Sequence, residues 1–175
     1  LQQVRAHPQL WLLALASGLN NVAFNWAVTI GDVVRVILLF YLMPAWAVLL
    51  AWRILGERPT PAALLRLALA FTGVVLVLLP EGAPASRLLQ NLSLADALAL
   101  LGGFMFALTN VTLRRLHTVP GPARMFAMFG GCMLMALAVA CIGLQVGVVE
   151  PLPAANATWI VTGLLLAGVL MLGNW

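Results

Sequence analysis

Arg35 is the charged side chain in this sequence best placed to bind a ligand within an apolar segment. Trp46 follows it by 11 residues, close to three whole helical turns, in the apolar stretch 33–55. A guanidinium above an indole face could hold a carboxylate or an aromatic group. The alternative is that Arg35 extends toward polar surroundings at the end of the segment, with Asp32 as its ion-pair partner.

Side-chain amides form a second candidate site. In the apolar segment 9–30, Asn21 and Asn25 share a helical stripe with Ala14 and Gly18, and Asn20 and Trp26 lie beside it. Amides in such a segment either bond across a helix–helix interface or line a polar cavity, and Asn110 and Asn174 have the same two interpretations. Tyr41 lies with Pro44 on a second face of segment 33–55.

Pro44 stands inside an apolar run that ends in the charged turn Arg53 to Arg58. A proline there removes a helical hydrogen bond and clashes one turn back. In lipid this is tolerated where neighbours or cavity water cover the freed carbonyl. We expect either an opening toward a cavity or a packing kink. Within the turn, Glu57 has a simple interpretation as a turn-stabilising carboxylate.

The residue pattern argues against an enzyme. The sequence has no Gly-rich phosphate loop, no paired carboxylates inside an apolar segment and no Cys/His ligand set. Cys132 and Cys141 lie nine residues apart, on opposite faces of a helix, which disfavours a disulfide or a shared metal. The arginines are scattered, unlike the basic patch of a nucleic-acid binder. We therefore expect no catalysis, cofactor, metal or nucleic-acid partner.

The composition indicates that lipid surrounds the chain. It is 63% apolar and 8% charged, whereas a soluble domain is about 45–50% apolar and about 25% charged. A membrane helix needs about 20 apolar residues. Six segments qualify: 9–30, 33–55, 61–80, 93–116, 123–146 and 158–175. The sequence thus predicts an all-α polytopic membrane protein.

The arginines predict its orientation. With a cytoplasmic N-terminus, seven of them fall on the inner side and two on the outer side, as the positive-inside rule requires. The inner set is Arg5, Arg53, Arg58, Arg66, Arg114, Arg115 and Arg124. Every carboxylate lies at or beyond a helix end, so we expect no coupling of transport to an acidic residue in these six segments.

A weak similarity between two segments of the sequence suggests an inverted repeat. The segments Trp11–Trp26 and Trp159–Trp175 both open with Trp and close with Asn-Trp, and they enter the membrane from opposite sides. Such repeats place a substrate site near the midplane. We expect residues 1–92 to complete a first five-helix repeat and residues 93–175 to begin a second, so that six helices of ten are visible.

Helix 33–55 also resembles a known family. Arg35-Val-Ile-Leu-Leu-Phe-Tyr-Leu-Met-Pro-Ala-Trp46, followed by Leu55-Gly-Glu-Arg-Pro-Thr60, is similar to the fourth helix of EamA-type drug/metabolite transporters. A central proline and a terminal Gly-Glu are characteristic there, and the likeness continues through Leu79-Pro80 and Ala95-Asp96. The resemblance covers helices three to eight of ten. It implies that Gly56 and Glu57 form a clasp or gate at the inner mouth.

Together these features predict an inverted-repeat bundle that transports small organic solutes by alternating access. The resemblance implies an exporter of metabolites, amino acids or drugs, and a homodimer stays open. A composition rich in Ala, Leu and Arg with no Lys indicates a bacterium, and so an inner membrane. We expect solute contacts from Asn21, Asn25, Trp26, Arg35, Tyr41, Trp46 and Asn110, and gating or shaping from Pro44, Gly56 and Glu57. The alternatives are a lipid-linked carrier or flippase, or a membrane sensor or scaffold that does not transport.

Overall fold

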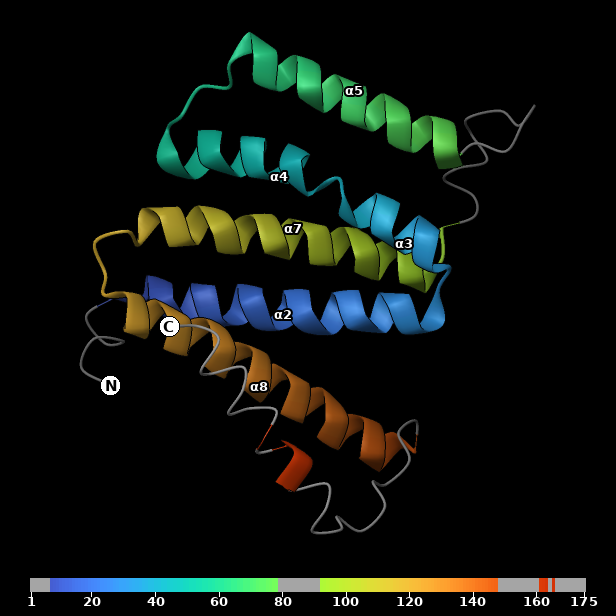
Figure 1. Cartoon of the computed structure of the whole chain (residues 1–175), viewed down its shortest axis with the longest axis vertical. Coiled ribbons are helices and arrows are strands. Elements are labelled where there is room, and N and C mark those ends of the chain that lie inside the picture. Colours follow the sequence, from blue (N-terminus) through green and yellow to red (C-terminus); the bar gives the residue numbers. More distant parts are fainter. Residues whose placement is uncertain (1–6, 79–91, 148–160, 164, 166–175) are drawn as a thin grey trace. The chain divides into compact units, whose positions relative to one another are not determined.

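The computed structural model describes residues 7–78, 92–147, 161–163 and 165, and every regular element in these ranges is a helix (Figure 1). The helices are α2 (Gln9–Ile30), α3 (Val33–Phe40), α4 (Met43–Leu50), the π-helical η1 (Ala51–Leu55), α5 (Pro61–Leu78), α7 (Leu94–Arg115) and α8 (Gly121–Val146). The chain divides into two units, residues 1–139 and 140–175, which we consider separately. The predicted all-α class is confirmed.

Four of the first five predicted segments coincide with single helices to within about two residues at each end, and segment 33–55 is divided among α3, α4 and η1. Among the described residues, three segments are long and apolar enough to cross a membrane: Val33–Leu55, Leu94–Arg115 and Gly121–Val146. The apolar part of α5, Pro61–Leu76, is shorter, and asparagines lower the hydropathy of α2. Of the sixth segment only 161–163 and 165 are described, as helix; the second of the two similar segments, Trp159–Trp175, including Asn174, otherwise lies outside the described residues.

Segment 33–55 differs from the single helix that its apolar run predicts. It breaks after Phe40 and resumes at Met43, with Pro44 at the second position of α4. Proline has no N–H to donate to the carbonyl four residues back, which here is that of Phe40. That carbonyl lies against α7, where a Cβ added to Gly103 would stand 2.8 Å from the oxygen. The glycine therefore lets α7 approach the backbone at the break.

Helix α7 packs against α2 on one side and against α3 and α4 on another (Figure 1). Its N-terminus carries a capping box, in which Ser93 accepts a bond from the Asp96 backbone and Asp96 accepts one from the Ser93 backbone. The core between α2, α3 and α7 consists of small and branched side chains: Ala27, Val36, Leu39, Leu42, Ala95 and Ala99. Small residues bring these backbones close together.

The part of α8 in the first unit crosses α2 at a glycine contact. A Cβ added to Gly131 would collide with the carbonyl of Ala14, and one added to Gly18 would stand 2.6 Å from the Gly131 carbonyl oxygen. Beside this contact the Ser17 hydroxyl donates to the Met128 carbonyl at 3.1 Å. Small residues and a polar side chain thus join α2 and α8 in the manner of membrane helices.

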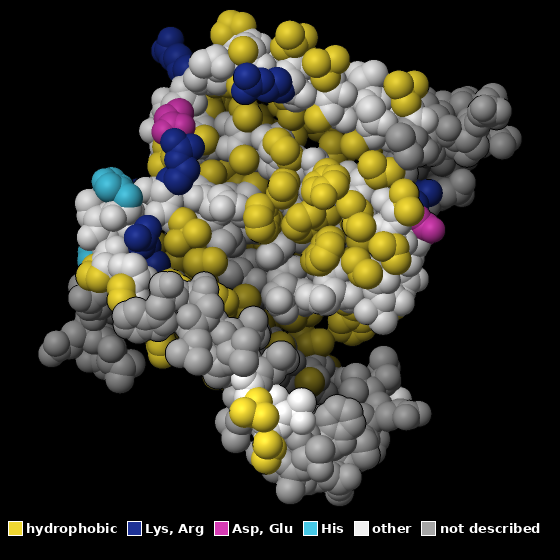
Figure 2. Space-filling view, in the orientation of Figure 1, with side chains coloured by type: hydrophobic (Ala, Val, Ile, Leu, Met, Phe, Trp, Pro, Cys, Tyr) yellow, Lys and Arg dark blue, Asp and Glu magenta, His cyan; other side chains and the backbone are white. Residues whose placement is uncertain are grey.

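The exterior of the first unit is apolar. Large side chains such as Trp11, Leu69 and Phe126 are exposed by 64%, 65% and 76%, and Figure 2 shows a broad hydrophobic area with dark blue basic side chains gathered mainly at one edge. An exposed apolar surface of this extent suits hydrocarbon rather than water. The chain is a multi-pass membrane protein.

Candidate functional site

Arg35 of α3 and Asp96 of α7 form an ion pair with two contacts. The Nε of Arg35 lies 2.7 Å from Oδ1 of Asp96, and its Nη2 lies 2.9 Å from Oδ2. Asp96 is buried to 1% exposure, whereas the Arg35 side chain is 32% exposed. Each residue is the third of its helix, and Asp32 caps α3 by accepting from the Arg35 backbone N–H at 2.9 Å. The two helix caps therefore fix the backbone positions from which the Arg35 and Asp96 side chains extend.

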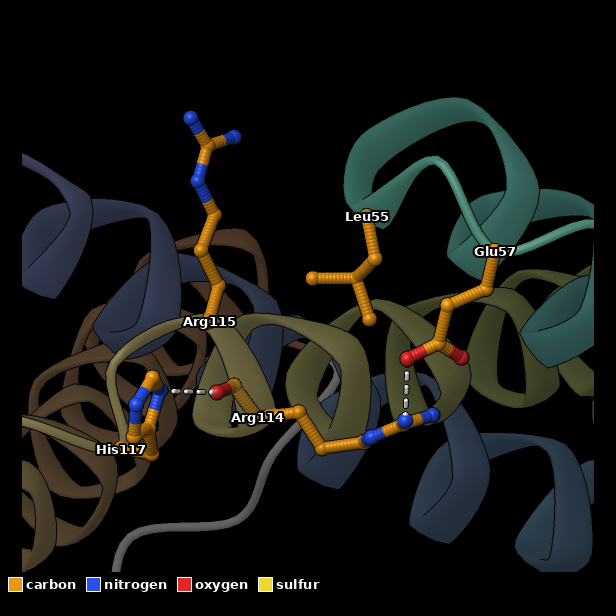
Figure 3. Close-up of a pocket in the computed structure, with 5 residues that line it drawn as sticks. All are labelled: Leu55, Glu57, Arg114, Arg115 and His117. Carbon is orange, nitrogen blue, oxygen red and sulfur yellow. Dashed lines mark hydrogen bonds and ion pairs between the residues drawn. The ribbon is translucent and has the colours of Figure 1, made fainter.

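Glu57 and Arg114 form a second ion pair, between the turn after η1 and the last turn of α7. Figure 3 shows Arg114 reaching the carboxylate, with Nη2 2.6 Å from Oε1. Both side chains are more than half exposed, at 51% and 59%. Gly56 ends η1 with a φ of 73°, a left-handed conformation that favours glycine, and nothing lies within 4 Å of where its Cβ would be. Gly56 is thus needed for the turn that presents Glu57, not for space.

These two ion pairs lie at opposite ends of the same two helical segments. Arg35 and Asp96 are near the starts of segments 33–55 and 94–115, and Glu57 and Arg114 are at their ends. The segments therefore run parallel, as expected when one helix, α5, lies between them in the chain and the direction reverses twice. The charges are exchanged between the two ends: segment 33–55 supplies the cation at one end and the carboxylate at the other.

Aromatic side chains occupy the region between the two ion pairs. The rings of Phe24 and Phe40 have centroids 4.5 Å apart, and those of Phe40 and Phe106 5.7 Å apart. Trp46 meets Phe104 edge-on at 5.6 Å, and its buried Nε1 has no hydrogen-bond partner among the described residues. A buried indole N–H normally finds a partner. Trp46 therefore offers a donor inside the bundle.

The predicted amide residues lie mostly on the surface of the described bundle. Asn21 and Asn25 are both exposed, and the Asn25 amide donates to the Asn21 carbonyl at 2.7 Å. Asn110 is exposed on α7 and donates to the Phe106 carbonyl at 2.9 Å. Asn20 is less exposed, and its buried Oδ1 has no partner among the described residues. Local backbone bonds thus use one amide donor of Asn25 and of Asn110 and leave their other polar atoms open.

The remaining predicted residues lie apart from the Arg35–Asp96 and Glu57–Arg114 pairs. Trp26 and Tyr41 are 40% and 56% exposed, and Pro44 is exposed beside the break in segment 33–55. The structure brings Arg35 to Asp96, and Trp46 to the aromatic rings. No group of three or more His, Cys, Asp or Glu side chains in the described ranges could hold a metal.

Asp96 and Arg114 are the two partners that sequence reasoning did not identify. A signal for each was present, because the predicted topology puts Asp96 at the same membrane side as Arg35, and Arg114 at the same side as Glu57. The Ser93-x-x-Asp96 spacing also marks a helix start. What the sequence lacked was evidence that segments 33–55 and 94–115 are neighbours.

Comparison with known proteins shows a similarity to a family. No curated protein matches the chain, and no solved structure does. The sequence model of the EamA-like transporter family matches residues 2–79, which contain α2, the broken segment 33–55 and α5. Pro44, Gly56 and Glu57 all lie inside the matched range. Members of this family are membrane transporters, and over residues 2–79 the chain is similar to the EamA-like transporter family.

Proposed function

We propose that this chain supplies helices three to eight of a ten-helix transporter that exports small organic solutes from a bacterium by alternating access. Residues 1–92 would complete one repeat and residues 93–175 would begin the inverted one, with the N-terminal side of α2 facing the cytoplasm. The proposed solutes are metabolites, amino acids or drugs. The observation that carries the proposal is the placement of the two ion pairs at opposite ends of segments 33–55 and 94–115.

The two ion pairs differ in strength, as is needed if segments 33–55 and 94–115 separate at one end and stay in contact at the other. Breaking a buried pair by removing one partner costs about 3–5 kcal/mol, and Asp96 is buried to 1% exposure. An exposed pair contributes only about 0–1 kcal/mol, and both Glu57 and Arg114 are more than half exposed. The Glu57 end therefore separates at a small free-energy cost, while the Arg35 end keeps α3 against α7.

The break at Pro44 allows the two ends of segment 33–55 to move separately. Two of its backbone bonds are long there: the Leu42 N–H meets the Leu39 carbonyl at 3.2 Å, and the Trp46 N–H meets the Leu42 carbonyl at 3.4 Å. Helices bend where proline interrupts the hydrogen-bond ladder. Bending at this break would swing α4 and η1 away from α7, opening the cytoplasmic end without disturbing the Arg35–Asp96 pair.

Solute contacts are assigned to the groups that retain free polar atoms. The Trp46 indole N–H and the Asn20 amide oxygen are buried without partners in the described ranges, and the exposed amides of Asn21, Asn25 and Asn110 keep open polar atoms. Because Arg35 is held by Asp96, we assign it to positioning the outer end of α3 first, with direct solute contact as the alternative.

Transport by the full-length protein in proteoliposomes tests this function. A panel of radiolabelled amino acids and cationic drugs is screened, and Trp46→Ala is then compared with Trp11→Ala, an exposed tryptophan of α2. We expect Trp46→Ala to reduce transport at least tenfold with folding intact, and Trp11→Ala to leave it unchanged. Equal transport by both variants would show that Trp46 takes no part in the solute path.

Cross-linking tests the gating. In a background with Cys132→Ser and Cys141→Ser, one variant carries Glu57→Cys with Arg114→Cys, and a second carries Arg35→Cys with Asp96→Cys. A short bis-methanethiosulfonate, which joins the two thiols through disulfides, should abolish transport in the first variant, and reduction of these disulfides should restore it. If cross-linking Glu57→Cys to Arg114→Cys leaves the transport rate unchanged, the inner ends do not separate during the cycle.

A further inference from the structure

An open pocket of about 360 Å³ lies where η1 and α7 end. Its lining consists of Leu55, Glu57, Arg114, Arg115 and His117. Figure 3 shows Arg114 directed toward Glu57, whereas Arg115 extends away from α7 in a different direction. The pocket is therefore lined by Arg114, which is paired with Glu57, and by Arg115, whose side chain points in another direction.

The charges of this pocket do not balance. Glu57 is the single carboxylate of the lining, and Arg114 binds it at 2.6 Å. In the described part of the chain no carboxylate lies within ion-pair distance of Arg115. The pocket thus has a net positive charge, carried by the guanidinium of Arg115.

His117 adds a polar group whose orientation is set by the backbone. Its Nδ1 lies 3.2 Å from the carbonyl oxygen of Arg114. A carbonyl only accepts, so Nδ1 carries the hydrogen in this contact and Nε2 is the ring's other polar atom. Leu55 supplies an apolar wall on the η1 side of the pocket.

From this arrangement we propose that the pocket binds a phosphate-bearing anion. A guanidinium binds phosphate through two parallel N–H···O bonds, and basic pockets between membrane helices on the cytoplasmic side suit lipid headgroups. The pocket lies at the ends of segments 33–55 and 94–115, and the ends of membrane-spanning helices meet the headgroup region. Leu55 suits the apolar part of an ester. The phosphate belongs either to an anionic phospholipid or to a free phosphate. The proposal does not depend on which solute is transported.

Glu57 competes with the anion in this arrangement. An arriving phosphate and the Glu57 carboxylate both attract Arg114, so removing the negative charge of Glu57 frees a second guanidinium for the ligand. Substitutions in one pocket should therefore change affinity in opposite directions. Glu57→Gln should strengthen anion binding and Arg115→Gln should weaken it, which a general effect of fold damage would not produce.

The test uses the purified, delipidated full-length protein and its thermal unfolding followed by tryptophan fluorescence. Dioleoyl phosphatidylglycerol is titrated in mixed micelles against dioleoyl phosphatidylcholine, and inorganic phosphate is titrated separately at constant ionic strength. We expect one of the two anions to raise the melting temperature. Arg115→Gln should weaken its apparent affinity about fivefold, the contribution of one arginine near a membrane surface, and Glu57→Gln should strengthen it.

Controls separate the outcomes. Arg66→Gln removes an exposed arginine of α5 outside the pocket and should leave the affinity unchanged, while Arg115→Lys should retain part of it. A shift with phosphatidylglycerol alone assigns the site to lipid, and an equal shift with inorganic phosphate assigns it to free phosphates. No shift with either anion, or equal weakening by Arg66→Gln and Arg115→Gln, overturns the proposal.

Discussion

Replacing Arg35 by glutamine leaves the Asp96 carboxylate buried without its cation. Asp96 has 1% exposure, and stranding one partner of a buried pair costs about 3–5 kcal/mol. The Ser93 backbone N–H would still donate to Asp96 at 2.9 Å, which supports the lower end of that range. We therefore expect Arg35→Gln to lower the free energy of unfolding by about 3 kcal/mol.

The reverse substitution should be milder. In Asp96→Asn the arginine side chain, already 32% exposed, can turn toward water or headgroups. Asparagine also keeps an oxygen to accept the Ser93 backbone bond. The expected loss is about 1 kcal/mol, the net value of the lost hydrogen bonding. The double variant Arg35→Gln with Asp96→Asn contains no stranded charge, so it should lose less than the sum of the two single changes.

Unfolding of the full-length protein in mixed micelles, followed by tryptophan fluorescence during titration with dodecyl sulfate, measures these differences. Arg53→Gln removes an exposed arginine from the same segment and should change stability by less than about 0.5 kcal/mol. If Asp96→Asn costs as much as Arg35→Gln, or if the two losses add, the pair is not the buried unit described above. Transport by the double variant then distinguishes the two roles of Arg35. If transport recovers in the double variant, Arg35 serves to position α3. If transport remains lost, Arg35 contacts the solute.

Three smaller perturbations test other contacts. Gly131→Ala should lower stability by about 1–3 kcal/mol, because its Cβ would collide with the Ala14 carbonyl, while Gly130→Ala, which meets open space, should be neutral or slightly stabilising in thermal melts. Gly56→Ala should cost about 1–2 kcal/mol through its φ of 73°, and calorimetry showing no loss would contradict the left-handed turn. Glu57→Gln should reduce stability by less than about 1 kcal/mol yet alter the transport rate, and a rate equal to that of the natural protein would contradict a gating role.

The positions of the helices could be read from the sequence because apolar runs and turn residues are local signals. The break of segment 33–55 could be predicted only in part. Pro44 predicts a lost hydrogen bond, but the glycine that covers the Phe40 carbonyl lies on another helix. The partners Asp96 and Arg114 depend on which helices are adjacent. Adjacency is decided by long-range packing at small residues such as Gly103, and a single sequence does not state which helix meets which.

Helix α2 supports the placement of the solute path on physical grounds. Its packed face includes the small residues Ala16, Ser17 and Gly18, which allow close approach of neighbouring helices. Its exposed face carries Asn21 and Asn25. Amides are poorly solvated by hydrocarbon, so polar groups at membrane depth face a cavity or other protein. That face should therefore meet water, a ligand or other protein, while the exposed apolar side chains of α5 and α8 meet lipid.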